Sequence, residues 1–125
     1  MKRDPEIIRK LLLFFEEKSD VNLAEAKSIK VDGHDPSVIQ YHIDLMYEAG
    51  FLSCETVNSS TSDRLIYALP FRLTWKGHEF LDAARNDTIW QKAKDVLGNK
   101  ALTVSFEVLY KLLSRLATED LPGLG

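Results

Sequence analysis

The sequence has 125 residues, of which 45% are hydrophobic and 28% are charged, and this ordinary globular composition excludes a disordered, fibrous or coiled-coil protein. The longest apolar run, residues 11–15, is too short to cross a membrane and no signal peptide opens the chain, so we expect a cytoplasmic protein. The net charge is −3, and residues 19–49 carry two basic against six acidic side chains, so that segment lacks the basic stripe typical of nucleic-acid binders.

The first helix is predicted to begin at Pro5, because Asp4 is a good N-cap residue and proline is favoured at the first helical position. Apolar residues recur with helical spacing as far as Lys18 and give this helix a wide buried face. The pattern then weakens. Residues 23–27 suit a helical turn and residues 28–31 alternate like a short strand, and both interpretations stay open.

Residues 35–52 form the segment around which the rest of the chain is organised. Asp35 can cap a helix that begins at Pro36, and Gly50 can supply the left-handed conformation that ends it. Helical spacing predicts a side that docks on the core, made of Ile39, His42, Ile43 and Met46. Such a helix, closed by Glu-Ala-Gly-Phe-Leu, resembles the recognition helix of winged helix-turn-helix proteins.

Two extended stretches, residues 51–57 and 64–73, flank a polar run and predict a β-hairpin in the position of a wing. Period-two alternation predicts the side that covers the core, which comprises Phe51, Leu65, Tyr67, Leu69, Phe71 and Leu73.

Helical patterns follow the hairpin. Thr74 can cap the first helix, and residues 86–88 can cap a fresh helical start that ends at Gly98, so a kink is expected near Asp87. If the helix is continuous, Trp75 and Trp90 lie about four turns apart and can face the same core side.

A last helix is predicted to open at Thr103 or Ser105, and residues 121–125 are expected to fray. Its inward side comprises Val108, Leu109, Leu112, Leu113 and Leu116.

Together these elements predict a mainly α protein with a small β-hairpin, an α+β arrangement in which a winged helix-turn-helix-like unit precedes two C-terminal helices. We expect a single domain over residues 1–125. Within it, residues 1–74 form the winged-helix-like core and residues 75–125 form the helical extension.

Three segments carry a resemblance to one family. They are Met-Lys-Arg-Asp-Pro-Glu-Ile-Ile-Arg-Lys-Leu at residues 1–11, Tyr-His-Ile with Glu-Ala-Gly within residues 41–50, and Arg-Leu-Thr-Trp-Lys-Gly-His-Glu-Phe-Leu-Asp-Ala-Ala-Arg-Asn-Asp-Thr-Ile-Trp at residues 72–90. The chain resembles the domain-of-unknown-function family 2513 over nearly its whole length. The resemblance implies a protein of bacteria and their prophages, and it implies no activity.

The first functional hypothesis is a bacterial or prophage DNA-binding transcriptional regulator whose partner is double-stranded DNA. In the major groove, the helix would present Ser37, Val38, Gln40, Tyr41 and Asp44. Gln40 can read adenine through a bidentate hydrogen bond, and Ser37 or Tyr41 can hold phosphates. In the wing, Arg64 and Arg72 can contact phosphates beside the hydroxyl-rich tip.

The alternative is a protein–protein interaction adaptor on the same scaffold, without DNA binding. DNA phosphates would repel Asp44. Regulators that resemble this pattern commonly place Arg or Lys where Tyr41 and Asp44 stand. Tyr41, Tyr47 and Val38 can instead form a patch for a protein partner, because aromatic residues are enriched at interfaces. A homodimer through the C-terminal helices is a further expectation, with closure of the monomer core as the competing use of their apolar residues.

No catalytic or cofactor motif stands out, so we expect neither an enzyme nor a cofactor. The single cysteine, Cys54, excludes an internal disulfide and a cysteine-rich zinc site. The spacings of His34, His42 and His78 match no pair of metal ligands, so no metal site is expected.

Overall fold

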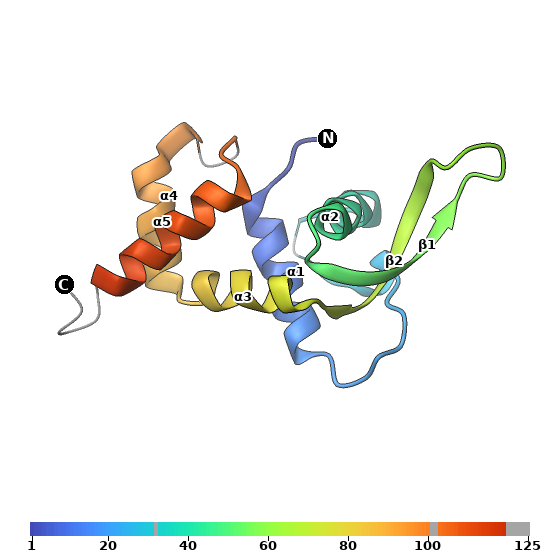
Figure 1. The fold of residues 1–125 in the computed structure, drawn as a ribbon, viewed down its shortest axis with the longest axis horizontal. Coiled ribbons are helices and arrows are strands. Elements are labelled where there is room, and N and C mark those ends of the chain that lie inside the picture. Colours follow the sequence, from blue (N-terminus) through green and yellow to red (C-terminus); the bar gives the residue numbers. More distant parts are fainter. Residues whose placement is uncertain (32, 101–102, 120–125) are drawn as a thin grey trace. The chain divides into compact units, whose positions relative to one another are not determined.

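The computed structural model describes residues 1–31, 33–100 and 103–119 (Figure 1). These residues form five α-helices, two short 3-10 turns and one two-stranded antiparallel sheet, which confirms a mainly α protein with a small β-hairpin. They separate into two compact units, Met1–His78 and the part from Glu79 onward. The single domain stays a prediction. None of the helices in the described ranges has the length and apolarity that a membrane span needs.

Helix α1 (Pro5–Glu17) opens unit 1 as its sequence predicts. The Asp4 carboxylate accepts the backbone N–H of Glu6 at 2.9 Å, so one of the donors that a helix start leaves unpaired is satisfied. The residues that α1 buries most deeply are Ile7, Ile8, Leu11, Leu12 and Phe15.

The segment between α1 and α2 contains one 3-10 turn, η1 (Ala26–Ser28). A short helical turn therefore exists close to the predicted place, whereas the strand over residues 28–31 is wrong. Ile29 and Val31 are buried with an exposed residue between them, so the alternation in the sequence records burial rather than strand pairing.

Helix α2 (Pro36–Glu48) buries the predicted side, Ile39, His42, Ile43 and Met46. Asp35 occupies the N-cap position, but its side chain makes no capping hydrogen bond. Gly50 has a φ of 83°, the left-handed conformation that glycine adopts without a steric penalty, and it leads the chain into the sheet.

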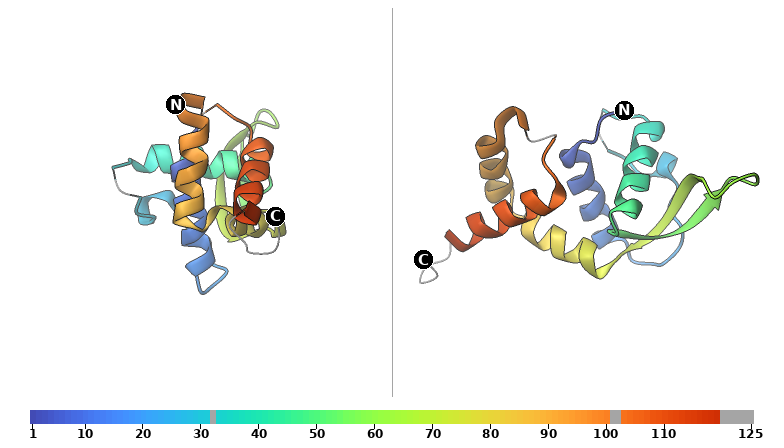
Figure 2. Two further views of the ribbon diagram at one scale, coloured as in Figure 1. Left: turned by 90° about the vertical axis from the view of Figure 1, so that its left-hand side faces the viewer. Right: turned by 45° about the horizontal axis from the view of Figure 1, so that its top comes forward.

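The hairpin consists of β1 (Leu52–Asn58) and β2 (Leu65–Leu73), and its tip extends away from α1 and α2 within unit 1 (Figures 1 and 2). The register pairs Ser53 with Arg72 but Cys54 with Pro70, so Phe71 is an extra, bulged residue, and Ile66 is a second one nearer the tip.

These bulges overturn part of the predicted core side. Each extra residue reverses the alternation of side chains, so Ala68 and Pro70 are the buried residues between the two bulges. Tyr67 is 36% exposed, contrary to the prediction, and Leu65, Leu69 and Phe71 are only partly buried. Phe51 and Leu73, which lie outside the bulged interval, are buried as predicted.

Helix α3 (Trp75–Ala84) contains the boundary between the two units, and α4 (Asp87–Leu97) follows it. The Asn86 side chain accepts the N–H of Ile89 at 3.0 Å and caps α4 as predicted. The helix is interrupted just before Asp87, as predicted, so the condition for a common core side of Trp75 and Trp90 is not met, and their shared core placement is wrong. Trp90 is 3% exposed and Trp75 is 81% exposed.

The 3-10 turn η2 (Gly98–Lys100) and helix α5 (Phe106–Glu119) complete the described part of the chain. Ser105 caps α5 by accepting the N–H of Val108 at 3.2 Å. Leu109 and Leu113 are buried as predicted, but Val108 is 51% exposed, so its inward placement is wrong. The predicted fraying of residues 121–125 lies outside the described residues.

Candidate functional site

The outward side of α2 carries an acidic and aromatic strip. Ser37, Tyr41, Asp44 and Glu48 follow one another at intervals of four, three and four residues, so they share the side opposite the buried one. Ser37 and Glu48 are exposed, and Tyr41 and Asp44 are partly exposed. The 13 residues of α2 include no Lys or Arg, so this outward strip bears carboxylates and no cation.

Glu48 was not among the predicted contact residues, although its spacing from Tyr41 could have placed it there. Val38 and Tyr47 flank the strip on either side; Val38 is partly buried and Tyr47 is 36% exposed. Six of the predicted contact residues therefore lie on α2, but they do not form one uniform face.

Two of those residues bind the hairpin instead of pointing freely into solvent. The Gln40 side-chain NH₂ donates to the Ala68 carbonyl at 2.8 Å and to the Asp44 carboxylate at 2.9 Å. The same Asp44 oxygen accepts the Ala68 backbone N–H at 2.8 Å. Both backbone groups of Ala68 are thus paired by a clamp made of Gln40 and Asp44.

The clamp takes the place of a neighbouring strand along the outer edge of β2. An edge strand leaves a row of unpaired backbone groups, and here α2 pairs two of them with side chains one turn apart. The predicted bidentate reading of adenine needs the Gln40 NH₂ group, both of whose hydrogens are committed to the clamp.

Removing the clamp carboxylate should weaken unit 1. We expect Asp44→Ala to lower the free energy of unfolding by about 2 kcal/mol, because the part-buried Ala68 N–H loses its acceptor. Urea denaturation measures this change, and hydrogen exchange of the Ala68 amide should become faster. Glu48→Ala, on the same helix but exposed, is the matched control and should change stability by less than about 0.5 kcal/mol.

The two predicted wing arginines lie at opposite ends of β2. Arg64 is exposed at the base of the tip, where its carbonyl accepts the Ser59 N–H at 2.8 Å. Arg72 is also exposed, and its guanidinium donates to the Leu73 carbonyl at 3.1 Å. With eight residue steps between them, these arginines are about 25 Å apart along the strand and do not form one cationic group.

Cys54 lies on β1 near the clamp. Burial raises the pKa of its thiol to about 12, and the negative charge of Asp44 adds to the shift. The thiol therefore stays protonated at neutral pH, which makes it a weak nucleophile.

The raised pKa of the Cys54 thiol can be tested by its rate of alkylation. At pH 8, alkylation of Cys54 by iodoacetamide should be about a thousandfold slower in the folded protein than in urea, because the thiolate fraction falls by that factor when the pKa rises from about 8.5 to 12. The folded-state pKa is raised, so the related stability is complete below pH 8 and is lost as the pH rises from there toward 12. An alkylation rate equal to that in urea would contradict this assignment.

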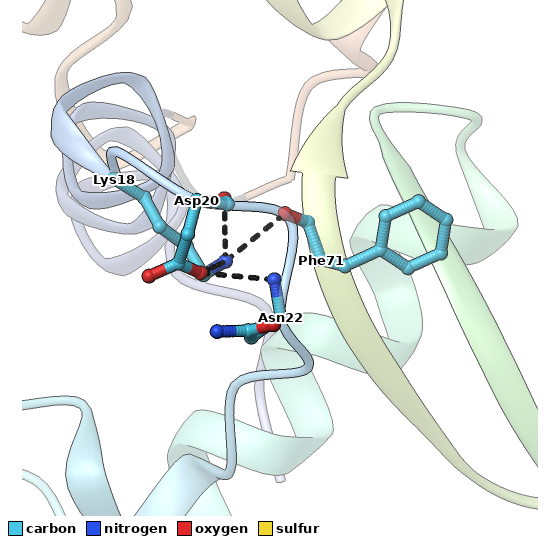
Figure 3. A network of polar contacts seen from close by, with 4 residues as sticks. All are labelled: Lys18, Asp20, Asn22 and Phe71. Atoms are coloured by element: carbon cyan, nitrogen blue, oxygen red, sulfur yellow. Dashed lines mark hydrogen bonds and ion pairs between the residues drawn. The ribbon is translucent and has the colours of Figure 1, made fainter.

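A second polar network joins Lys18, Asp20, Asn22 and Phe71 (Figure 3). The Lys18 ammonium, whose side chain is only 11% exposed, donates to the Asp20 carboxylate at 2.7 Å, the Asp20 carbonyl at 2.8 Å and the Phe71 carbonyl at 3.4 Å. The Lys18 hydrogen bond and the backbone N–H of Asn22 lower the pKa of Asp20. This network fastens the loop after α1 to the bulge of β2.

A cavity of about 490 Å³ lies beside this network. Its lining includes Lys18, Asp20, Arg72, His78 and the exposed Trp75. Charges of both signs line it, and Lys18 is already paired, so the cavity has no clear preference for an anionic or a cationic ligand. Within the described residues, no group of three or more His, Cys, Asp or Glu side chains could hold a metal ion.

The fold and the surface define a small, mainly helical protein with a two-stranded hairpin and an acidic, aromatic outer helix. The profile of the family described as "Hypothetical protein (DUF2513)" matches residues 2–103, and the chain belongs to this family. It is similar to an "Uncharacterized protein" of Haemophilus influenzae, with 32% identity over 124 residues that cover 97% of this chain and 99% of that protein. No solved structure matches the chain.

Proposed function

We propose that unit 1 is a winged helix-turn-helix module that serves as a protein–protein interaction adaptor through the outward strip of α2. The observation that carries this proposal is the cation-free strip Ser37, Tyr41, Asp44 and Glu48, in which Asp44 is already committed to the clamp. The proposal includes no catalytic step, and it places the protein in the cytoplasm of a bacterium.

The order of elements supports the winged-helix assignment. A helix, a short turn, a second helix and a hairpin follow one another in α1, η1, α2 and β1–β2. The backbone N–H of Ala24 donates to the Pro70 carbonyl at 2.8 Å, where the third strand of a winged helix would pair. The helix that usually precedes the recognition helix is reduced to the single turn η1.

The charge of α2 favours a protein over DNA. Neutralisation of phosphates by Lys and Arg supplies most of the affinity of DNA-binding proteins, and α2 offers carboxylates instead. Tyr41 and Tyr47 provide aromatic surface of the kind that anchors protein interfaces.

Site-specific photo-crosslinking tests the adaptor proposal in the native host. A benzoylphenylalanine at position 41 should yield a discrete protein adduct that persists after nuclease treatment. The same group at Gln91, an exposed position of α4, is the matched control and should yield none. No adduct at position 41, or the same adducts at both positions, would refute the assignment of this strip.

A second function, DNA binding, is favoured by one specific observation. Lys27 and Lys30 line a cavity of about 270 Å³ together with His34 and Pro36, the first residue of α2, and the two ammonium groups could contact phosphates beside the helix start. Fluorescence anisotropy with a random-sequence duplex at low salt decides between the two functions. If the duplex binds, and binding weakens steeply with salt and is lost in Lys27→Ala/Lys30→Ala, DNA binding replaces the adaptor function as the proposal. If the duplex does not bind, DNA binding is refuted.

A further inference from the structure

The two edges of the hairpin differ in how their backbone groups are used. On the outer edge of β2, the Gln40–Asp44 clamp pairs Ala68, and the Ala24 N–H pairs the Pro70 carbonyl. Pro70 has no N–H, so it leaves no donor unpaired there. The outer edge of β2 is therefore paired from Ala68 to Pro70.

The outer edge of β1 is open. Ala68 directs both its backbone groups toward α2, so Thr56, its partner in the antiparallel register, directs both of its own away from β2. The backbone N–H and C=O of Cys54, two residues earlier in the strand, are directed away from β2 in the same way. Within the part of the chain that the structure describes, neither residue makes a hydrogen bond through these outward groups.

Two of the usual protections of an edge strand are missing from β1. Its sequence, Leu-Ser-Cys-Glu-Thr-Val-Asn, contains neither Lys nor Pro. The irregularities at Ser53/Cys54 and Val57/Asn58 limit the regular part to residues 54–57. This length offers a short template for one added strand.

Glu55 lies in the middle of this template. It is exposed and forms no ion pair among the described residues. Its backbone faces β2, so a strand added on the other side would meet it in a non-hydrogen-bonded pair, where opposing side chains come closest. A cation opposite Glu55 would be favoured there.

We propose that the outer edge of β1 binds an extended peptide segment, which adds as a third, antiparallel strand and places Lys or Arg opposite Glu55. Backbone hydrogen bonds to Cys54 and Thr56 hold the segment, and Glu55 selects its charge. A second copy of this chain fits less well, since both copies carry a net charge of −3 and pairing centred on Glu55 would oppose two carboxylates. The proposal concerns a surface different from the outward strip of α2.

An NMR titration with a capped peptide, Thr-Val-Thr-Lys-Thr-Val-Thr, tests this proposal on the full chain. We expect saturable shifts of the Cys54 and Thr56 amides and slower hydrogen exchange of both. The same peptide with Glu in place of Lys should bind about fivefold more weakly, as expected for exchanging an attractive cross-strand pair for a repulsive one. No binding at millimolar peptide, or equal binding of the two peptides, would overturn the proposal.

Variants separate the backbone contribution from the charge. Glu55→Lys should reverse the preference between the two peptides, and Thr56→Pro should abolish binding because it removes an outward N–H. If Thr56→Pro fails to fold, methylation of the peptide amides on either side of its Lys tests the same bonds in the unaltered protein, and undiminished binding would refute strand addition. Tyr41→Ala should leave the titration unchanged, so its result does not depend on the adaptor proposal.

Discussion

Gly77→Ala should lower the free energy of unfolding by about 3 kcal/mol, or the melting temperature by about 10 °C. An added Cβ at Gly77 would lie 2.3 Å from the Phe51 carbonyl oxygen and 3.1 Å from its carbonyl carbon. These are backbone atoms, and the same oxygen accepts the Thr74 N–H at 3.0 Å, so relief of the clash costs a hydrogen bond. The better helix propensity of alanine returns only about 1 kcal/mol.

Thermal unfolding followed by circular dichroism measures this loss. Gly33→Ala is a suitable control, because Gly33 has a φ of 78° but no atom within 4 Å of the added Cβ. Gly33→Ala should lower the free energy of unfolding only by the strain of holding alanine in the left-handed conformation, about 1 kcal/mol. Equal melting temperatures for Gly77→Ala and the unaltered protein would contradict the close approach of α3 to Phe51.

His42→Leu should be the second large loss, about 2–3 kcal/mol. His42 is fully buried; its Nε2 accepts the backbone N–H of Asp4 at 2.9 Å, and its Nδ1 lies 2.8 Å from the Val38 carbonyl. Both contacts are satisfied together when the ring is neutral with its proton on Nδ1. Leucine would fill the space but leave the Asp4 N–H without an acceptor at the start of α1.

The tautomer and the variant can be tested separately. Nitrogen chemical shifts of the imidazole should report a protonated Nδ1 and an unprotonated Nε2. In urea denaturation, His42→Gln should lose less stability than His42→Leu, because its side-chain oxygen can accept the Asp4 N–H. If the leucine variant is as stable as the unaltered protein, the His42 link between α1 and α2 contributes nothing.

The structure explains one residue of the motif Trp-Lys-Gly-His-Glu-Phe-Leu-Asp, which carries the family resemblance. Its glycine, Gly77, is required by the approach of Phe51, a residue 26 positions earlier in the chain. Sequence inspection marks the glycine as part of the motif, but the contact that explains it is long-range.

The outward strip of α2 is the part of the candidate site that the sequence alone could predict. Helical spacing placed Ser37, Tyr41 and Asp44 on one side, and the structure brings these residues to one strip. The spacing could not reveal that Gln40 and Asp44 bind Ala68, because that residue lies on a different element.

By itself, the sequence determined the local elements of this protein. Asp4, Pro5, Pro36, Gly50 and Asn86 set helix boundaries through caps, fixed φ angles and a left-handed turn, all of which depend on neighbouring residues. It also determined the family and the absence of cations from α2.

Only the tertiary structure decided the sides of the hairpin and the use of its edges. The bulges at Phe71 and Ile66 reverse the alternation because the register depends on the opposite strand, and no local pattern encodes that pairing. The Gln40–Asp44 clamp pairs the backbone of Ala68 on one edge of the hairpin, whereas the outward backbone groups of Cys54 and Thr56 on the other edge have no partner among the described residues. Which backbone groups find partners depends on segments that are distant in the sequence, so it is decided only when the chain folds.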